Sequence, residues 1–419
     1  MNKTDLIIIG AGPGGYRAAE YAAKQGLKVV IFEGSDVGGT CLNVGCIPTK
    51  TYVHSATFEE ARERMSKVVS QLRTGVEGIL SHPNITLVRN KACFLDTYTV
   101  GAAGSDPSEA FSAPSIIVAT GSETKWLPIP GRDDPRVVDS TGLLNVESLP
   151  KRLCIIGAGV IGMEFASVFH RFGSEVTVIE YLKECLPALD SDIAKRLRKL
   201  LERTGITFRM KTAVENLCDI DADLILMATG RKPRVQEDFA KAGFDYDERQ
   251  GIVVDNHFQT TVKGIYAIGD VNGRQMLAHA AEMQAVHAVN HLIGKPDNIR
   301  FDIMPAAIFT NPEAACVGPT EEQLKSQAVA YECRKAFWRA NGKALAMGET
   351  EGMLKLFFTP LSDAQAAGTI LGCHAFGAHA ADIVQEVSVL MCCHATVAQL
   401  ADMVHIHPTL SEILLSAVD

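Results

Sequence analysis

The chain has 419 residues, of which 47% are hydrophobic and 21% are charged, and its net charge is -9. This composition is typical of a folded protein with a full core, and the acidic balance argues against a general binder of nucleic acids or anionic membranes. The sequence lacks a long apolar run, and "MNKTDLIIIG" lacks the pattern of a signal peptide. We therefore expect no membrane span and a cytoplasmic protein.

The first predicted unit is "LIIIGAGPGGYRAAEYAAKQGLKVVIFE", residues 6–33, which reads as a strand, a glycine-rich turn, a helix and a second strand. Gly10, Gly12 and Gly15 follow the spacing G-x-G-x-x-G. The first glycine permits a tight turn, the second lets the backbone approach a pyrophosphate, and the third lets the helix pack on the strand. Glu33 ends the second strand, where an acid accepts hydrogen bonds from ribose hydroxyls. The unit predicts a dinucleotide site at a helix N-terminus.

Two cysteines follow in "GGTCLNVGCIPTK", residues 38–50. In a regular helix Cys41 and Cys46 would be separated by a rise of about 7.5 Å, whereas the Cα atoms of a disulfide usually lie within about 6.8 Å. If they bond, the segment must be distorted, and Gly45 supplies that freedom. Pro48 is compatible with the start of a regular helix.

Three roles are open to this cysteine pair. A zinc site would need more ligands, and no second C-x-x-C exists, although His405 and His407 could supply two. A structural disulfide between residues so close would stabilise the chain little. The pattern therefore favours a redox-active dithiol and no metal. We expect the other nine cysteines to be small buried hydrophobic residues: Cys93, Cys154, Cys185, Cys218, Cys316, Cys333, Cys373, Cys392 and Cys393.

The first unit is repeated without a gap in "LCIIGAGVIGMEFASVFHRFGSEVTVIE", residues 153–180. Gly157, Gly159 and Gly162 repeat the glycine spacing, and Glu180 takes the place of the first acid. Strands ending in Ala-Thr-Gly then occur once in each half, in "IIVATGS" and "LILMATG". A further strand, "GIYAIGD", ends in an acid and would complete a first domain that a second one interrupts.

From about residue 299 the pattern changes. "IMPAAIFTNPEAACVG", "MLKLFF" and "TILGCHAFG" predict antiparallel strands. The apolar run "AADIVQEVSVLMCCHATVAQLADMV" predicts helix with a break near Ala395–Thr396, and places Cys392 and Cys393 well inside a helix. These elements carry too many apolar side chains to remain exposed to water, so we expect them to form a subunit interface.

These features together resemble the flavin-dependent pyridine nucleotide–disulfide oxidoreductases, from residue 5 to residue 415. The most specific marks are the cysteine segment, the two glycine fingerprints, "AIGD", "PAAIFTNPEAACVG", "RANGKALAMGETEGMLKL" and "HPTLSE". The resemblance implies an α/β fold with two Rossmann-like dinucleotide-binding domains, one inserted in the other, and a C-terminal α+β dimerisation domain. The implied ranges are 1–135 and 264–298 for FAD, 136–263 for NAD and 299–419 for dimerisation.

The resemblance also implies the reaction and its residues. Protein-bound dihydrolipoamide would be reoxidised through Cys41 and Cys46, with electrons passing through FAD to NAD. Cys46 would lie against the flavin and Cys41 would exchange with substrate sulfur. The implied general acid–base is His407, oriented by Glu412. Lys50 would lie near the flavin and pair with Glu164.

The remaining implied residues bind the cofactors. For FAD they are Gly10, Gly12, Gly14, Gly15, Glu33, Gly39, Thr40, Lys50, Thr120, Gly121, Asp270 and Ala278. For NAD they are Gly157, Gly159, Gly162, Glu180, Val214 and Gly230. The implied partners are a second copy of the chain and a lipoyl domain, either of a 2-oxoacid dehydrogenase acyltransferase or of the glycine-cleavage H protein.

Three alternatives remain. A glutathione-reductase-like enzyme would read the phosphate of NADP with arginines, but here Tyr181 and Leu182 follow Glu180, whose carboxylate would repel it. A mercuric-reductase-like enzyme would account for a pair of adjacent cysteines. Such a pair would be expected in a terminal tail, whereas Cys392 and Cys393 are predicted to lie inside a helix. A non-catalytic flavoprotein scaffold would be expected to lack the cysteine pair or His407. The chain is also shorter than the family pattern between Thr212 and Asp223, which puts partner docking in doubt.

Overall fold

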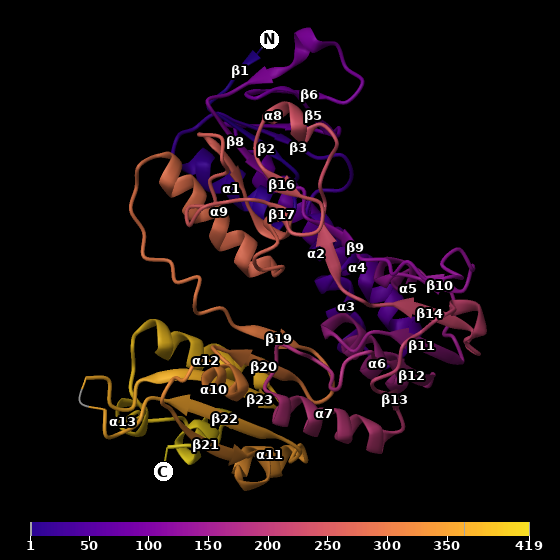
Figure 1. Ribbon diagram of the computed structural model, residues 1–419, viewed down its shortest axis with the longest axis vertical. Helices are drawn as coiled ribbons and strands as arrows, with labels where there is room; N and C mark the ends of the chain where they lie inside the picture. The colour runs from indigo at the N-terminus through magenta and orange to yellow at the C-terminus, as the bar shows by residue number, and fades with distance from the viewer. Residues whose placement is uncertain (1, 364, 419) are drawn as a thin grey trace. The chain divides into compact units, whose positions relative to one another are not determined.

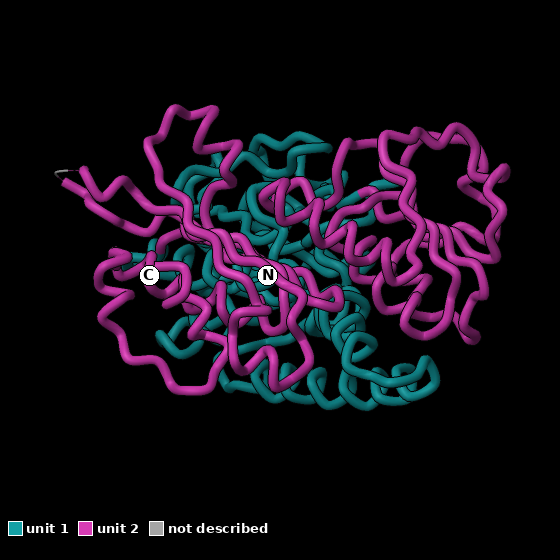
Figure 2. The backbone as a smooth tube through the Cα atoms, turned by 90° about the horizontal axis from the view of Figure 1, so that it is seen from below, with its two compact units in different colours: residues 1–126, 230–299 teal, residues 127–229, 300–419 magenta. Residues whose placement is uncertain are grey.

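The computed structural model describes residues 2–363 and 365–418 (Figure 1). The chain forms two compact units, each made of two separate stretches (Figure 2). Unit 1 consists of residues 1–126 and 230–299, and unit 2 consists of residues 127–229 and 300–419. In the described ranges, no helix combines the length and the apolar character needed to cross a bilayer.

Unit 1 is built on a parallel five-stranded sheet with the order β18-β8-β2-β3-β4. Its strands are β2 (Leu6–Ile9), β3 (Val29–Phe32), β4 (Ile85–Val88), β8 (Ser115–Val118) and β18 (Ile265–Ala267). All four residues of β2 and of β3 are buried. Such continuous apolar strands are expected where both faces of a parallel sheet are covered.

Five helices of unit 1 position its candidate site. Helices α1 (Pro13–Lys24) and α9 (Ala278–Leu292) lie side by side (Figure 1). The cysteine segment forms α2 (Gly39–Val44) and α3 (Cys46–Val53), which pack on the long α4 (Phe58–Leu80).

The rest of unit 1 consists of short elements around this sheet. They are β1 (Asn2–Lys3), β5 (Ala92–Asp96), β6 (Thr99–Ala102), η1 (Pro107–Glu109), β7 (Phe111–Ser112), β9 (Ser122–Thr124), β15 (Arg231–Pro233), α8 (Phe239–Ala242), β16 (Tyr246–Asp247), β17 (Gly251–Ile252) and η3 (Gly269–Asn272).

Unit 2 contains a second parallel sheet, with the order β10-β14-β11-β12-β13. Its strands are β10 (Val137–Val138), β11 (Arg152–Ile156), β12 (Glu175–Ile179), β13 (Thr207–Arg209) and β14 (Leu224–Met227). The accompanying helices are α5 (Ser140–Leu144), α6 (Val160–Phe172), α7 (Ser191–Thr204) and η2 (Leu217–Asp219).

The C-terminal part of unit 2 is an antiparallel sheet with the order β19-β20-β23-β22-β21. Its strands are β19 (Ala306–Ile308), β20 (Ala314–Val317), β21 (Glu332–Phe337), β22 (Met353–Phe358) and β23 (Ile370–Phe376). Around it lie α10 (Glu321–Ser326), η4 (Trp338–Ala340), α11 (Gly342–Met347), α12 (Ala380–Cys392), α13 (Val397–Ala401), η5 (Leu410–Glu412) and α14 (Ile413–Ser416). The break between α12 and α13 confirms the one predicted near Ala395–Thr396.

The fold class predicted from the sequence is confirmed. The two glycine-rich repeats both form a strand, a helix and a parallel second strand, β2-α1-β3 and β11-α6-β12. The antiparallel C-terminal sheet is also present. Residues 230–263 group with unit 1, and the three domain ranges themselves stay a prediction.

The prediction about the nine remaining cysteines is partly wrong. Cys218, Cys392 and Cys393 are exposed, and Cys93 and Cys333 are only partly buried. The adjacent pair does not lie well inside a helix, because α12 ends at Cys392. His394 follows in the left-handed region (φ 54°), where a helix cannot continue.

Candidate active site

The two cysteines of the motif are brought together by a break between two helices. Cys41 lies in α2, Cys46 begins α3, and Gly45 separates them with φ -138° and ψ -114°. A Cβ atom on Gly45 would lie 2.8 Å from the carbonyl oxygen of Thr40, so a larger residue would not fit there. The distortion predicted at Gly45 is therefore confirmed.

The Cys41 thiol lies close to that of Cys46. This contact and burial raise the pKa of Cys41 well above its ordinary value, while the nearby Lys50 opposes the shift. Because the thiolate is the nucleophile in sulfur exchange, a base must take the Cys41 proton. The pair can supply dithiol–disulfide chemistry, provided that a general base serves it.

Two residues that the sequence analysis missed hold the backbone before the first cysteine. The side-chain amide of Asn43 donates to the carbonyl oxygens of Val37 (3.0 Å) and Gly39 (2.9 Å). Arg73 of α4 donates to Asn43 Oδ1 at 2.8 Å and forms an ion pair with Asp36 at 3.0 Å. Asn43 lies inside the cysteine motif, so its position was a signal, but nothing in the sequence linked it to Arg73.

The first glycine fingerprint forms a backbone cradle at the start of α1. A Cβ on Gly15 would lie 1.8 Å from Gly10 O, and one on Gly39 would lie 2.7 Å from Gly12 Cα. Only glycine permits these approaches, which leave the N-terminal amides of the helix accessible to a ligand. Gly14 packs on α9, where a Cβ would meet Ala281 at 3.3 Å.

Glu33 lies where the fingerprint requires an acid. Its Oε2 accepts the N–H of Ala11 at 2.7 Å, and its Oε1 accepts the N–H of Ser35 at 2.9 Å. The bare glycine cradle and an adjacent carboxylate fit the pyrophosphate and ribose of a dinucleotide such as FAD.

Other predicted FAD residues lie beyond the carboxyl ends of the parallel strands. Thr120 donates its hydroxyl to Arg234 O at 3.0 Å, and Gly121 follows with φ 74°. Asp270 lies in η3, Ala278 begins α9, and Thr40 is exposed on α2.

Asp270 belongs to a polar chain that the sequence analysis also missed. Its Oδ2 accepts the hydroxyl of Ser122, and Arg231 Nε donates to that hydroxyl oxygen at 2.7 Å. Ser122 and Asp270 are 148 residues apart in sequence, so no local pattern could join them.

The second fingerprint repeats the cradle in unit 2. A Cβ on Gly162 would lie 2.0 Å from Gly157 O, whereas one on Gly159 would meet nothing within 4 Å. Glu180 Oε2 accepts the N–H of Ala158 at 2.6 Å, as Glu33 does with Ala11. The open space at Gly159 beside this carboxylate fits a second dinucleotide.

The other predicted NAD residues lie apart in the chain. Val214 is half-buried in the loop after β13 of unit 2. Gly230, with φ 99°, belongs to unit 1.

Glu164 is buried in α6, and its Oε1 accepts the N–H of Phe309 at 2.9 Å. Lys50, its expected partner, lies on α3 of unit 1. The pairing of the two residues stays a prediction.

His407 and Glu412 form the expected pair near the C-terminus. His407 Nδ1 lies 2.8 Å from Glu412 Oε1, and the N–H of Thr409 donates to Glu412 Oε2 at 2.8 Å. The Thr409 amide and the His407 contact lower the pKa of Glu412. The carboxylate therefore stays ionised where an imidazole titrates, and can stabilise its protonated form. The His407 side chain is 79% exposed, and its Nδ1 is the ring nitrogen that faces Glu412.

Comparison with known proteins agrees with this geometry. The family model described as pyridine nucleotide-disulphide oxidoreductase matches residues 4–285. The model of the dimerisation domain of the same family matches residues 304–418. The chain therefore belongs to the pyridine nucleotide-disulphide oxidoreductase family. Members of this family use FAD and NAD(H), and the chain is a flavin-dependent oxidoreductase.

Curated relatives and solved structures narrow the comparison. Dihydrolipoyl dehydrogenase, mitochondrial, of Pisum sativum is 35% identical over 460 residues, covering 99% of this chain and 91% of its own length. Dihydrolipoyl dehydrogenase 3 of Pseudomonas putida is 36% identical over 461 residues, covering 100% of this chain and 98% of its own. The HOCl-induced flavoprotein disulfide reductase RclA from Escherichia coli has a TM-score of 0.92 at 32% identity, covering 99% of each chain.

Proposed function

We propose that the protein is a dihydrolipoyl dehydrogenase. It reoxidises protein-bound dihydrolipoamide with the Cys41–Cys46 pair and passes the electron pair by way of FAD to NAD. The observation that carries the proposal is the contact of the two thiols across the break at Gly45. The names of the Pisum sativum and Pseudomonas putida relatives support the same substrate.

The cysteines and His407 carry the sulfur chemistry. His407 accepts a proton from the substrate dithiol, whose thiolate attacks Cys41 in the oxidised enzyme and displaces Cys46 as a thiolate. His407 then gives its proton to the Cys41 sulfur and takes the proton of the second substrate thiol, whose sulfur displaces Cys41. This closes the lipoyl disulfide and leaves both enzyme cysteines reduced, Cys41 as a thiol and Cys46 as a thiolate. Glu412 holds the His407 ring and stabilises the imidazolium.

The cofactor sites follow from the two glycine cradles. Gly10, Gly12 and Gly15, with Glu33, would hold FAD, and Lys50 with Glu164 would face the flavin ring. Gly157, Gly159, Gly162 and Glu180 would hold NAD. When bound, FAD accepts the electron pair of the dithiol and delivers it as hydride to nicotinamide.

The dimerisation domain supports a homodimer. We place the enzyme in the cytoplasm, and its physiological substrate on a lipoyl domain, either of a 2-oxoacid dehydrogenase acyltransferase or of the glycine-cleavage H protein. The sulfur chemistry supports this substrate, because a lipoyl group presents two thiols that can close into one disulfide.

The direct test is steady-state turnover of the purified protein. We expect a yellow protein that oxidises NADH when lipoamide is supplied and not when glutathione disulfide or Hg²⁺ replaces it. Faster turnover of glutathione disulfide with NADPH would contradict the proposal in favour of a glutathione-reductase-like enzyme. A flavin-loaded protein that turns over none of the three would favour a scaffold.

The enzyme is expected to prefer NAD over NADP by at least about 30-fold in kcat/KM. Glu180 lies against the fingerprint loop, where it can accept from a ribose 2′-hydroxyl but opposes a 2′-phosphate. Leaving such groups unpaired costs about 2 kcal/mol, which corresponds to that factor. Steady-state kinetics with both cofactors measures the preference.

Glu180→Ala should reduce the preference, whereas Glu175→Ala should preserve it. Glu175 is an exposed carboxylate at the opposite end of the same strand, which makes it a matched control. Comparable kcat/KM values for the two cofactors in the wild-type enzyme would contradict the role of Glu180.

A further inference from the structure

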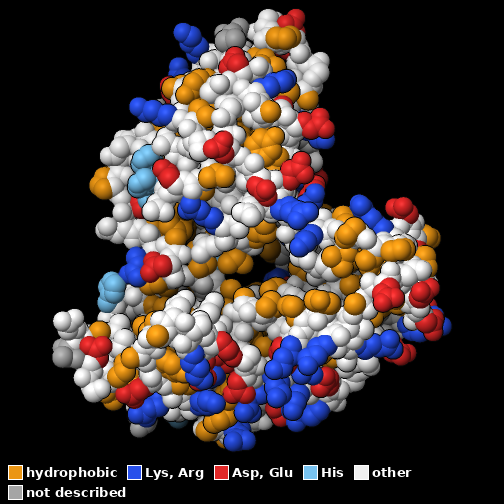
Figure 3. Space-filling model, in the orientation of Figure 1, with side chains coloured by type: hydrophobic (Ala, Val, Ile, Leu, Met, Phe, Trp, Pro, Cys, Tyr) orange, Lys and Arg blue, Asp and Glu red, His pale blue; other side chains and the backbone are white. Residues whose placement is uncertain are grey.

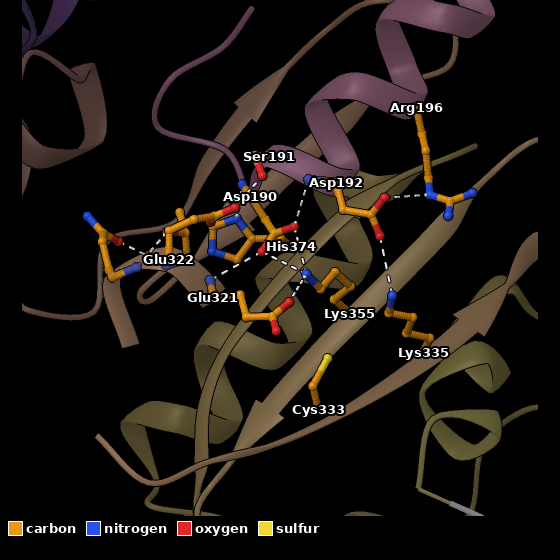
Figure 4. A network of polar contacts seen from close by, with 12 residues as sticks. Asp190, Ser191, Asp192, Arg196, Glu321, Glu322, Cys333, Lys335, Lys355 and His374 are labelled. Carbon is orange, nitrogen blue, oxygen red and sulfur yellow. Dashed lines mark hydrogen bonds and ion pairs between the residues drawn. The ribbon is translucent and has the colours of Figure 1, made fainter. Parts of the chain in front are cut away.

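Unit 2 contains a buried ionic cluster outside the proposed site (Figure 4). Asp190 has a fully buried side chain, and both of its carboxylate oxygens accept from Lys355 Nζ, at 2.8 and 2.9 Å. Lys355, whose side chain is 1% exposed, also donates to Glu321 Oε2 at 2.6 Å. The three N–H groups of the ammonium thus have three acceptor oxygens, two from Asp190 and one from Glu321.

Asp190 is also held through its backbone. Its N–H donates to His374 Nδ1 at 3.0 Å, and His374 Nε2 lies 3.1 Å from Pro319 O. Because Nδ1 accepts, the proton must be on Nε2 and the ring is neutral. Burial lowers the pKa of His374, in agreement with this state. Asp190 is therefore fixed by β22, β23 and α10 together.

Asp190 ends the segment that runs beside the second fingerprint, residues 182–190. At its start, the N–H of Leu182 donates to Glu180 Oε1 at 2.7 Å. In its middle, the N–H of Leu186 donates to Ala158 O at 2.9 Å. Ala158, between the first two glycines of the fingerprint, therefore has its N–H on Glu180 and its C=O on this segment.

The middle of the segment is constrained as well as bonded. Leu186 has φ 49°, in the left-handed region that a leucine rarely adopts, and its side chain is 2% exposed. Such a conformation persists only where the surroundings determine it. Asp190 supplies the fixed end, because it caps α7 through the N–H of Asp192 at 3.1 Å and accepts the N–H of Glu321 at 3.2 Å.

We infer that Lys355, Asp190 and His374 are positioning residues for pyridine nucleotide. They fix the end of segment 182–190, which in turn sets the fingerprint loop at Ala158 and the Glu180 carboxylate. The inference rests on the proposed NAD site. A buried ion pair is often no more stabilising than apolar residues of the same volume. The cluster can also fix the position and orientation of Asp190, because each of its contacts is a hydrogen bond.

The test is Lys355→Met in the FAD-loaded enzyme. We expect the KM for NAD to rise at least fivefold while kcat stays within twofold and FAD content is unchanged. We also expect faster amide hydrogen exchange in segment 182–190, measured without pyridine nucleotide. The matched control is Lys335→Met, which removes an exposed lysine of β21 that pairs with Asp192 of α7 at 3.3 Å. Lysine and arginine side chains gather on a face of unit 2 over α7 (Figure 3). In Lys335→Met both measurements should stay within twofold of wild type.

A lower melting temperature with unchanged KM and unchanged exchange in segment 182–190 would show a purely structural role and overturn the inference. If Lys355→Met does not fold, Asp190→Asn makes the same test, because asparagine retains the capping oxygen and loses the charge. A wild-type enzyme that does not respond to NAD would contradict the proposed function. The exchange measurement, which needs no cofactor, would still decide the positioning of the segment.

Discussion

Cys41→Ser and Cys46→Ser are each expected to reduce lipoamide turnover by at least about a thousandfold, the scale on which removing a catalytic nucleophile acts, while FAD stays bound. A serine hydroxyl cannot form the mixed disulfide or close the enzyme disulfide, so the electron pair has no route from the substrate. The glycine cradle and Glu33 are untouched by either change. Lipoamide turnover and flavin absorbance measure the two effects separately.

The two thiols should also differ from each other. An absorption band from a flavin–thiolate contact should rise on two-electron reduction of the wild-type enzyme and disappear in Cys46→Ser, because Cys46 is the thiol proposed to face the flavin. Cys218→Ser, which changes an exposed cysteine of unit 2, serves as a control and should behave as wild type. Near-normal lipoamide turnover in either active-site variant would disprove the redox dithiol.

Activity is expected to return when an inactive Cys41→Ser chain exchanges subunits with an inactive His407→Ala chain. The prediction is that His407 of one protomer serves the cysteines of its partner. A mixed dimer would then contain one site with both substitutions and one intact site. About half of the sites in mixed dimers should be active, and lipoamide turnover after exchange measures this. Loss of a general acid–base alone reduces turnover by about 100-fold or more, so the recovery is easily seen.

The exposure of the His407 segment is the physical reason for this expectation. Val404 is 100% exposed and Ile406 is 79% exposed, and both shortly precede His407, whose side chain is 79% exposed. Apolar side chains so placed are expected to be covered by another protein surface, and the family match supplies a dimerisation domain there. The control mixes two Cys41→Ser chains with different tags. If tagged subunits exchange and no activity returns, His407 acts within its own chain or not at all.

Local patterns in the sequence predicted the parts of the molecule that local physics determines. Both glycine fingerprints lie at strand–helix turns because a Cβ at Gly15 or Gly162 would collide with the turn itself. The break at Gly45 followed from the length of a helical rise and the reach of a disulfide. His407 and Glu412 are only five residues apart, so their contact is local in sequence.

Contacts between distant parts of the sequence could not be predicted in this way. Lys355 and Asp190 are 165 residues apart, and neither carries a motif. The hydrophobic pattern of an apolar strand such as "MLKLFF" does not reveal which distant residue pairs with its lysine. The exposure of Cys392 and Cys393 was missed for a related reason, since the apolar run continues past the residue at which the backbone leaves the helix.

The position of β18 has a consequence for the order in which the protein is made. In the sheet of unit 1, β8 pairs with β2 on one side and with β18 on the other, and β18 is encoded after the whole inserted stretch of unit 2. During synthesis the nascent chain must therefore hold β8 as an open sheet edge while the inserted sheet, from β10 to β14, emerges from the ribosome. At roughly 5–20 residues per second that wait lasts on the order of ten seconds. An edge open for so long can pair with neighbouring nascent chains, so the demand for chaperones should be greatest before residue 267 is added, and should fall once β18 closes the edge.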